Sequence, residues 1–355
     1  MTTDRIKKIC VILGAGASKD IAGEGAPIVQ SEFQPPLARD LFNISNHRAY
    51  WEIMNIYNGA KILTQELAQL VSSGPIPIED ALRRYAEHPD ERIRQHFKHI
   101  PAYLRDLLWR VSSAYVPMPT NYVRLVVELL AHNPHDVLFL VLNYDNLLES
   151  ALSHFDTKFE FKNMPQYVAS DRQAKVVKLH GSINWFKLLP GDQGESWETL
   201  VTKIDISKEL SERIYIDDNS ERVANRVIED HRVYPVLTAP LAGKGISDAV
   251  CPKDHINTAK EFLHDCNKFL IIGSSGLDKD LLNLLDSAIN TELHPVVHIV
   301  DMDQGADKAR TRFYDGVRAF RNSDIVPPIT VFKNGFRIYL NDAQLQRFAA
   351  SPEVV

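Results

Sequence analysis

Cysteine is scarce in this chain of 355 residues: Cys10, Cys251 and Cys266 are the only three, and they lie far apart. An odd, sparse set argues against a disulfide framework and fits a reducing cytosol, so we expect a cytoplasmic protein. No two of them form a Cys-x-x-Cys pair, and three thiols cannot build a four-cysteine zinc site. We therefore expect no zinc or other metal.

Long apolar runs and an excess of positive charge are also absent. No stretch of 18 apolar residues occurs, and residues 1–6 lack the apolar core of a signal peptide, so we expect no membrane segment. The formal net charge is −6, from 40 Lys and Arg against 46 Asp and Glu. This balance gives no general attraction to nucleic acid or to an anionic membrane, and we expect neither as a direct partner.

Short apolar segments alternate with helical patterns along most of the sequence. Strands are predicted over residues 8–13, 136–142, 175–179, 268–272, 296–300 and 329–332, with helices over 146–154, 278–289 and 306–319. Segment 136–142 is almost continuously apolar, as expected of a strand buried on both faces. The fold class is therefore predicted as α/β, with a doubly wound, mostly parallel Rossmann-like sheet. A polar tail is expected after the last strand.

A segment of different character separates the first two predicted strands. Apolar residues recur there at helical spacing, and Gly-Pro and Pro-rich breaks divide the helices. We predict a helical insertion subdomain over residues 44–132, with a role in gating or oligomerisation, and a Rossmann-type domain over residues 1–43 and 133–355. The polar, acidic stretch 191–232 is expected to form an excursion or flap.

Small or polar residues follow five of the predicted strands. They are residues 14–18, Asn143 to Asp145, His180 to Ser182, Gly273 to Ser275, and Asp301. Ligands of open α/β sheets bind at the carboxyl ends of the strands, so these groups are the candidate site. Their convergence is a stronger signal than any one of them.

The first of these groups is a glycine turn, composed of Gly14, Ala15, Gly16, Ala17 and Ser18. Glycines after a strand let backbone N–H groups approach a phosphate. Lys19 stands where a dinucleotide fingerprint has its third glycine, and no Gly-Lys-Ser/Thr follows, so neither a standard dehydrogenase nor a P-loop is indicated. The alternative is a tight strand-to-helix turn without a ligand.

The other groups also have simpler interpretations. Asn143 and Asp145 are suited to a turn and a helix N-cap before residue 146. His180 is compatible with a hydrogen-bonded histidine at a strand end. Ser18 is compatible with a helix cap, and Asp301 with a surface turn.

The order Gly-Ala-Gly-Ala-Ser, Asn-Tyr-Asp, Leu-His-Gly-Ser and Gly-Ser-Ser resembles the sirtuin (Sir2) NAD-binding domain. Three longer phrases resemble the bacterial SIR2-like branch that acts in antiphage defence: Pro-Pro-Leu-Ala-Arg-Asp-Leu-Phe, Lys-Leu-His-Gly-Ser-Ile-Asn-Trp and Ile-Ile-Gly-Ser-Ser-Gly-Leu-Asp-Lys-Asp. The resemblance covers about residues 5–43 and 134–320 and leaves out the helical insertion.

The resemblance implies a role for each group. Residues 14–18 would cradle the NAD+ pyrophosphate, and Gly273 and Ser274 would hold the distal phosphate or ribose. Asp301 would meet the adenosine ribose. Asn143, Asp145 and His180 would match the asparagine, aspartate and histidine of the sirtuin catalytic motifs. Breaking the nicotinamide–ribose bond needs an oriented water and a proton acceptor, which an amide and a histidine can supply.

Departures from the sirtuin pattern bear on the reaction. The chain cannot build the four-cysteine zinc ribbon, Leu142 replaces a glutamine, and residues 25–28 read Gly-Ala-Pro-Ile instead of the Gly-x-Pro-Asp-Phe-Arg loop. Water is therefore the favoured nucleophile, which predicts an NAD+ hydrolase (NADase) releasing ADP-ribose and nicotinamide. An NAD-dependent protein deacylase and a non-catalytic NAD or ADP-ribose-binding module are the alternatives.

The resemblance also implies partners. An ungated NAD+ hydrolase would drain the cell, so a gated antiviral effector is expected. It would act as a homo-oligomer beside a separate protein such as a HerA-like ATPase or an Argonaute-like protein.

Overall fold

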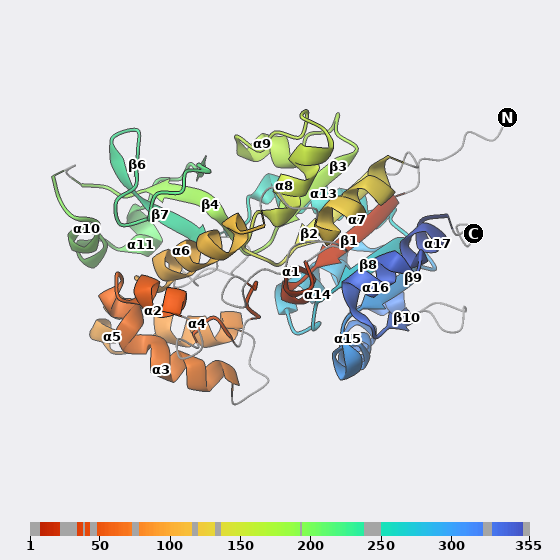
Figure 1. Ribbon diagram of the computed structural model, residues 1–355, viewed down its shortest axis with the longest axis horizontal. Helices are drawn as coiled ribbons and strands as arrows, with labels where there is room; N and C mark the ends of the chain where they lie inside the picture. The colour runs from red at the N-terminus through yellow and green to blue at the C-terminus, as the bar shows by residue number, and fades with distance from the viewer. Residues whose placement is uncertain are drawn as a thin grey trace.

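A six-stranded parallel sheet occupies one half of the molecule, on the right in Figure 1. The computed structural model describes residues 8–21, 34–37, 40–42, 48–72, 78–115, 120–131, 136–191, 194–237, 250–321 and 329–350. The strands are β1 (Lys8–Leu13), β2 (Asp136–Val141), β3 (Ala174–Lys178), β8 (Lys268–Ile272), β9 (Val296–Val300) and β10 (Ile329–Phe332). Their order is β10-β9-β8-β1-β2-β3. This doubly wound order confirms the predicted α/β class.

Helices cover both faces of this sheet, which explains its apolar strands. Along β1, Ile9 and Val11 pack with one set of helices, while Cys10 and Ile12 pack with the other. The first set is α7 (Asn121–Leu130), α8 (Leu147–Phe155), α16 (Gly335–Asn341) and α17 (Gln344–Ala350). The second is α13 (Lys253–His264), α14 (Lys279–Ala288) and α15 (Asp303–Gly316), with the short helix η3 (Arg318–Phe320). No helix within the described ranges is long and apolar enough to cross a bilayer.

The expectation of a polar tail after β10 is wrong. The chain continues there as α16 and α17, and their apolar sides are buried against the sheet, with Phe336 and Phe348 almost fully covered. The buried Lys268 ammonium donates hydrogen bonds to the carbonyl oxygens of Phe348 and Ala349, at 3.1 and 2.9 Å. A cation at a helix C-terminus satisfies carbonyls that have no partner inside the helix.

The other half of the molecule combines helices with a small antiparallel sheet (Figure 1). This sheet has the order β5-β4-β7-β6, from β4 (Gly181–Leu188), β5 (Tyr215–Ile216), β6 (Val227–Ile228) and β7 (His231–Leu237). It shares a core with residues of α2 (Arg48–Met54), α3 (Asn58–Ser72), α4 (Ile78–Ala86), α5 (Glu91–Phe97), α6 (Ile100–Ser113), α10 (Trp197–Lys203) and α11 (Ile206–Glu209). The stretch predicted as a flap therefore contributes to a packed unit. The division into residues 44–132 and the remainder stays a prediction.

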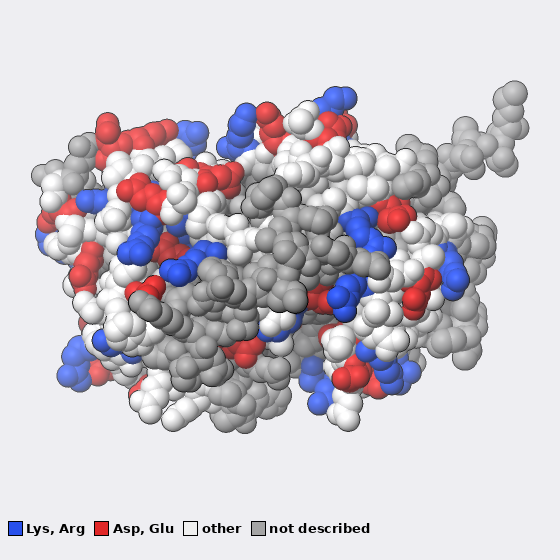
Figure 2. All heavy atoms as spheres, in the orientation of Figure 1, with Lys and Arg blue, Asp and Glu red and all other residues white. Residues whose placement is uncertain are grey.

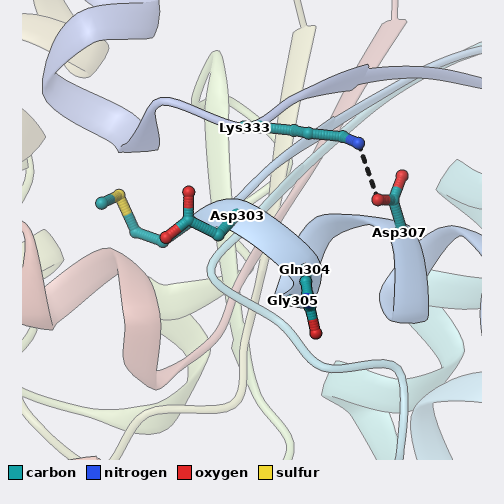
Figure 3. Close-up of a pocket in the computed structure, with 6 residues that line it drawn as sticks. Asp303, Gln304, Gly305, Asp307 and Lys333 are labelled. Carbon is teal, nitrogen blue, oxygen red and sulfur yellow. Dashed lines mark hydrogen bonds and ion pairs between the residues drawn. The ribbon is translucent and has the colours of Figure 1, made fainter.

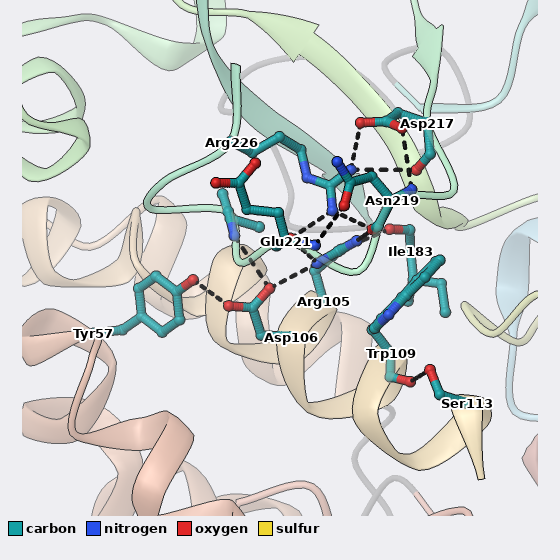
Figure 4. Close-up of polar contacts among 11 residues, drawn as sticks. Tyr57, Arg105, Asp106, Trp109, Ser113, Ile183, Asp217, Asn219, Glu221 and Arg226 are labelled. Atoms are coloured by element: carbon teal, nitrogen blue, oxygen red, sulfur yellow. Dashed lines mark hydrogen bonds and ion pairs between the residues drawn. The ribbon is translucent and has the colours of Figure 1, made fainter. Parts of the chain in front are cut away.

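Two buried arginines tie α6 to the small sheet and the loop after β5 (Figure 4). Arg105 donates to the carbonyl oxygens of Ile183, Glu221 and Asn219 at 3.0, 2.8 and 2.9 Å. Arg226 donates to the same Asn219 and Glu221 carbonyls. Each guanidinium also forms an ion pair with a carboxylate, which compensates for the burial of its charge. These contacts stabilise the junction between α6, the small sheet and the loop after β5.

Acidic and basic side chains are interspersed over the face shown in Figure 2. This mixture agrees with the modest net charge of −6. It offers no extended field of one sign on the described part of that face.

Candidate functional site at the carboxyl ends of the strands

The chain order of the main sheet reverses between β1 and β8. From β1 the chain moves outward through β2 to β3, and on its return it places β8 on the other side of β1. In doubly wound sheets, ligands bind in the crevice at such a switch point, outside the carboxyl ends of the strands. The glycine turn and Gly273 follow these two central strands.

Three glycines let the ends of β1 and β8 touch through their backbones. The Gly14 N–H donates to the Ile272 carbonyl at 2.9 Å, and the Gly16 N–H donates to the Gly273 carbonyl at 3.0 Å. A Cβ on Gly16 would stand 2.7 Å from the Gly273 Cα, and a Cβ on Gly273 would overlap the Ala17 nitrogen. Gly273 also has a φ of +61°, a left-handed conformation that favours glycine.

The close contact between the ends of β1 and β8 explains why glycine is needed at these positions, and the sequence alone did not reveal this contact. The N–H groups of Gly14 and Gly16 are already used by carbonyls at the end of β8. The short helix α1 (Ala15–Lys19) begins at once, with Ala15 only half-buried. The assignment of residues 14–18 to a phosphate therefore stays a prediction.

Asn143 lies at the centre of a buried polar cluster behind this turn. Its Nδ2 is within hydrogen-bond distance of the Gly14 carbonyl (3.0 Å), the Ser18 Oγ (2.8 Å) and the Tyr122 hydroxyl (3.3 Å). Ser18 donates in turn to Asp145 Oδ2 at 2.8 Å. The structure thus brings together four predicted site residues, two from the N-cap and body of α1 and two from the loop after β2. Tyr122, on α7, was not predicted as a site residue. The sequence analysis used the apolar spacing of this segment only to predict a helix.

Asp145 combines a place in the cluster with a local role. Its Oδ1 accepts the Leu147 N–H at 3.3 Å at the start of α8, although the N-cap position of that helix is Asn146 and not Asp145. Burial raises the pKa of Asp145 above its usual value, although the charge of Lys178 and the Ser18 hydrogen bond oppose the rise. Lys178 also donates to the Asp145 backbone carbonyl and pairs with Glu149 at 2.9 Å.

His180 follows β3 and is paired with a residue that the sequence reasoning missed. Its Nε2 hydrogen-bonds Asp278 Oδ2, and the His180 side chain is almost fully buried. Asp278 is the N-cap of α14, where its Oδ1 accepts the Leu281 N–H at 2.7 Å. Burial alone would raise the pKa of Asp278, but the His180 hydrogen bond and charge outweigh it and hold that pKa below its usual value.

The signal for Asp278 was present in the phrase Gly-Ser-Ser-Gly-Leu-Asp after β8, although no role was assigned to its aspartate. The Tyr144 ring packs edge-on against His180, with centroids 6.4 Å apart. Tyr144 directly follows Asn143, and β2 and β3 are neighbours, so the two polar groups lie at adjacent strand ends. Among the described side chains, no hydrogen bond joins Asn143 directly to His180.

Asp301 lies away from these groups, at the end of β9. Three strand spacings separate β9 from β2, or about 14 Å. The Asp301 Oδ1 accepts the Met302 N–H at 2.8 Å, as a turn residue would. Burial raises the pKa of Asp301 despite this bond. Ser274, the residue after Gly273, is buried between the two regions.

An open pocket of about 700 Å³ adjoins Asp301 (Figure 3). It is lined by Met302, Asp303, Gln304, Gly305, Asp307 and Lys333, and Lys333 pairs with Asp307 at 2.7 Å. The pocket extends the row of strand-end residues toward β10. Within the described part of the chain, no three metal-ligating side chains come together.

Comparison with known proteins identifies the family. A family model described as a SIR2-like domain matches residues 137–319, which is more than half of the chain. The chain belongs to the SIR2-like family. The matched span of this SIR2-like chain runs from β2 to η3 and so includes Asn143, His180, Gly273 and Asp278, whereas the glycine turn lies before it.

Several solved structures are similar to this SIR2-like chain at low identity. A triple mutant of a Sir2 homologue in complex with 2′-O-acetyl ADP ribose is 11% identical, with a TM-score of 0.48 and coverage of 98% of this chain and 95% of that one. A Sir2 homologue in complex with NAD is 11% identical, with a TM-score of 0.42 and coverage of 98% and 92%. No curated protein matches the sequence.

Proposed function

We propose that this SIR2-like protein is an NAD+ hydrolase that cleaves the nicotinamide–ribose bond. The observation that carries the proposal is the buried His180–Asp278 pair at the end of β3, beside the Asn143 cluster at the switch point of the sheet. Membership of a family of NAD-using enzymes supports NAD+ as the substrate.

In the proposed reaction, the oxygen of a water forms a bond to the anomeric carbon of the nicotinamide ribose. The carbon–nitrogen bond breaks, and its electron pair neutralises the pyridinium nitrogen of the departing nicotinamide. Asp278 accepts the hydrogen bond of the His180 Nε2–H and so fixes the imidazole tautomer. A proton from the water, or from a ribose hydroxyl, then passes to the other ring nitrogen of His180.

Asn143 is suited to hold the water or the ribose through its carbonyl oxygen. Its Nδ2 hydrogens are directed toward Gly14 and Ser18, so the amide is oriented by groups of the protein. The Oδ1 atom can then accept a hydrogen bond from the substrate side. Asp145 acts through Ser18, which it holds in place.

The remaining residues are proposed to bind the rest of the dinucleotide. Since the Gly14 and Gly16 amides are engaged, the turn would serve mainly to bring its surface at Ala15 close to the pyrophosphate. Gly273 and Ser274 would approach from β8, and Asp301 would meet the adenosine ribose beyond β9. No metal takes part in this scheme.

The proposed activity requires control. An ungated hydrolase would exhaust cellular NAD+, which supports the role of a gated effector in bacterial antiphage defence, as the sequence resemblance implies. We place the control in homo-oligomer contacts of the helical insertion and in a separate HerA-like or Argonaute-like partner. The cytoplasm, where NAD+ is available, is the matching location.

The test is incubation of the full chain with NAD+, alone and with the proteins encoded beside it, while nicotinamide and ADP-ribose are followed by chromatography. Both products should form, and Asn143→Ala and His180→Ala should abolish them. Full activity in both variants would overturn the site assignment. Formation of O-acetyl-ADP-ribose with an acetyl-lysine peptide would instead support a deacylase. Tight binding of NAD+ without turnover, even with the partner, would support a binding module.

A further inference from the structure

A second pocket, of about 510 Å³, lies between α6, α8 and β4, where the two halves of the molecule meet. Its lining residues are Trp109, Ser112, Ser113, Asn146, Glu149, Ser150, Ser153, Phe161, Asn184 and Asp218. Figure 4 shows two of them, Trp109 and Ser113, on α6 next to the arginine junction. None of the lining residues belongs to the proposed NAD+ site. The volume is that of a site for a small molecule.

Two residues of the lining, Glu149 and Asn184, each carry a buried acceptor atom. Glu149 and Asn184 are only 4% and 1% exposed, and among the residues described, neither Glu149 Oε2 nor Asn184 Oδ1 has a hydrogen-bond partner. The other polar atoms of these side chains are engaged: Glu149 Oε1 accepts from Lys178 at 2.9 Å, and Asn184 Nδ2 donates to Asp218 at 2.9 Å. Buried polar atoms are rarely left without a partner, so a ligand that donates hydrogen bonds fits here.

The serines of the lining also offer acceptors. Ser113 donates its hydroxyl hydrogen to the Trp109 carbonyl, and Ser153 donates to the Phe159 carbonyl, both at 2.7 Å. Each hydroxyl therefore has lone pairs left for a ligand. Among the described residues of the lining there is no lysine, arginine or histidine, and the exposed Asp218 adds a negative charge at the rim.

Aromatic rings supply flat surfaces in the same pocket. Trp109 and Phe161 both line it, and the Arg105 guanidinium already stacks on the Trp109 ring at 4.6 Å. Rings of this kind attract planar cations. The nearby positive charges of Lys178 and Arg105 will moderate the affinity, and the Glu149 and Asp218 carboxylates offset them.

We propose that this pocket is a binding site for a small planar cation of the amidinium or guanidinium class. Its N–H groups donate to Glu149 Oε2 and Asn184 Oδ1, and its plane lies against an aromatic ring of the lining. The site is separate from the NAD+ site and does not depend on the proposed hydrolysis.

The test is calorimetric titration of the full chain with benzamidine, neutral benzamide and anionic benzoate, three probes of nearly the same shape. Benzamidine should bind saturably, benzamide at least about tenfold more weakly, and benzoate not at all. Ser150→Phe, which fills the pocket from α8, should abolish benzamidine binding. Asp218→Asn should weaken it about threefold, because an exposed charge contributes little. Ser170→Phe and Asp171→Asn, exposed and outside the pocket, are the matched controls and should bind normally.

Several outcomes would overturn the site. They are the absence of saturable binding, equal binding of benzoate, unchanged binding by Ser150→Phe, and displacement of benzamidine by NAD+. Should Ser150→Phe fail to fold, a crystal structure of the wild-type chain with benzamidine decides: the amidine must lie within hydrogen-bond distance of Glu149 Oε2. Density elsewhere would refute the proposal.

Discussion

His180 and Asp278, 98 residues apart in the sequence, are hydrogen-bonded between the end of β3 and the N-cap of α14. The His180 side chain is 2% exposed and that of Asp278 is 12% exposed, so the interaction is largely shielded from solvent and salt. One carboxylate oxygen of Asp278 is bonded to the imidazole, and the other accepts the Leu281 amide. It therefore fixes the helix and the histidine with one side chain, which makes it a positioning residue in the proposed reaction.

Asp278→Asn should separate these two roles. Asparagine caps a helix about as well as aspartate, so stability should change little, but the negative charge beside the imidazole is lost. We expect kcat for nicotinamide release to fall about 10- to 100-fold with KM nearly unchanged. Asp286→Asn, on the same helix and paired with Arg318, is the control and should keep the wild-type rate. A change in KM alone, with kcat preserved, would contradict the positioning role.

The sequence predicted the main sheet well because its strands are buried on both faces. A strand such as β2 is then apolar at nearly every position. The predicted limits of four other strands are the same as the observed ones: β1, β8, β9 and β10. Two strands of the small sheet, β5 and β6, were not predicted, for the opposite reason. Strands β5 and β6 have two residues each, too few to show an alternating pattern.

The candidate site was predictable in position but not in its contacts. Asn143 and His180 mark strand ends, and parallel strands bring their ends to one edge of a sheet. Their partners Tyr122 and Asp278 come from helices distant in sequence, and only tertiary packing selects them. The tail was misread because Phe336 and Phe348 are spread among polar residues that face solvent.

Gly273→Ala should destabilise the fold through a backbone collision. The added Cβ would overlap the Ala17 nitrogen, and the φ of +61° adds strain. We expect a loss of more than about 2 kcal/mol in the free energy of unfolding, measured in urea. Gly276→Ala is the matched control, since its φ is +68° but the nearest atom to its Cβ is a side-chain carbon at 3.1 Å. It should lose about 1 kcal/mol. Equal losses would show that the contact between β1 and β8 contributes nothing.

Tyr122→Phe should reduce activity by loosening the Asn143 amide. The hydroxyl lies 2.9 Å from Ser18 Oγ and 3.3 Å from Asn143 Nδ2. Its removal should cost about 1 kcal/mol of stability and lower kcat several-fold. Tyr103→Phe, which loses a buried bond of 2.7 Å to the Leu41 carbonyl, should cost similar stability and leave kcat unchanged. If both variants lose activity equally, the effect comes from general destabilisation.

His298 should make the fold sensitive to mild acid. Burial, with a smaller effect of Lys268, lowers the pKa of His298 from 6.5 to about 4. Below pH 6.5 the unfolded chain therefore takes up a proton that the folded chain refuses, so stability is lost as the pH falls from 6.5 toward 4. By pH 5 this histidine alone should account for up to about 2 kcal/mol. The ring is hydrogen-bonded through Nδ1 to the Tyr339 hydroxyl at 2.9 Å and packs against Phe348, so α16 and α17 should loosen first.

The measurement is urea unfolding at pH 7.5 and pH 5, for the wild type and His298→Phe. The variant is expected to lose stability at neutral pH, because the Tyr339 hydroxyl loses its partner, but to show a smaller difference between the two pH values. The exposed His154→Asn serves as the control and should keep the wild-type difference. A pH difference in His298→Phe as large as that of the wild type would assign the acid sensitivity to other groups.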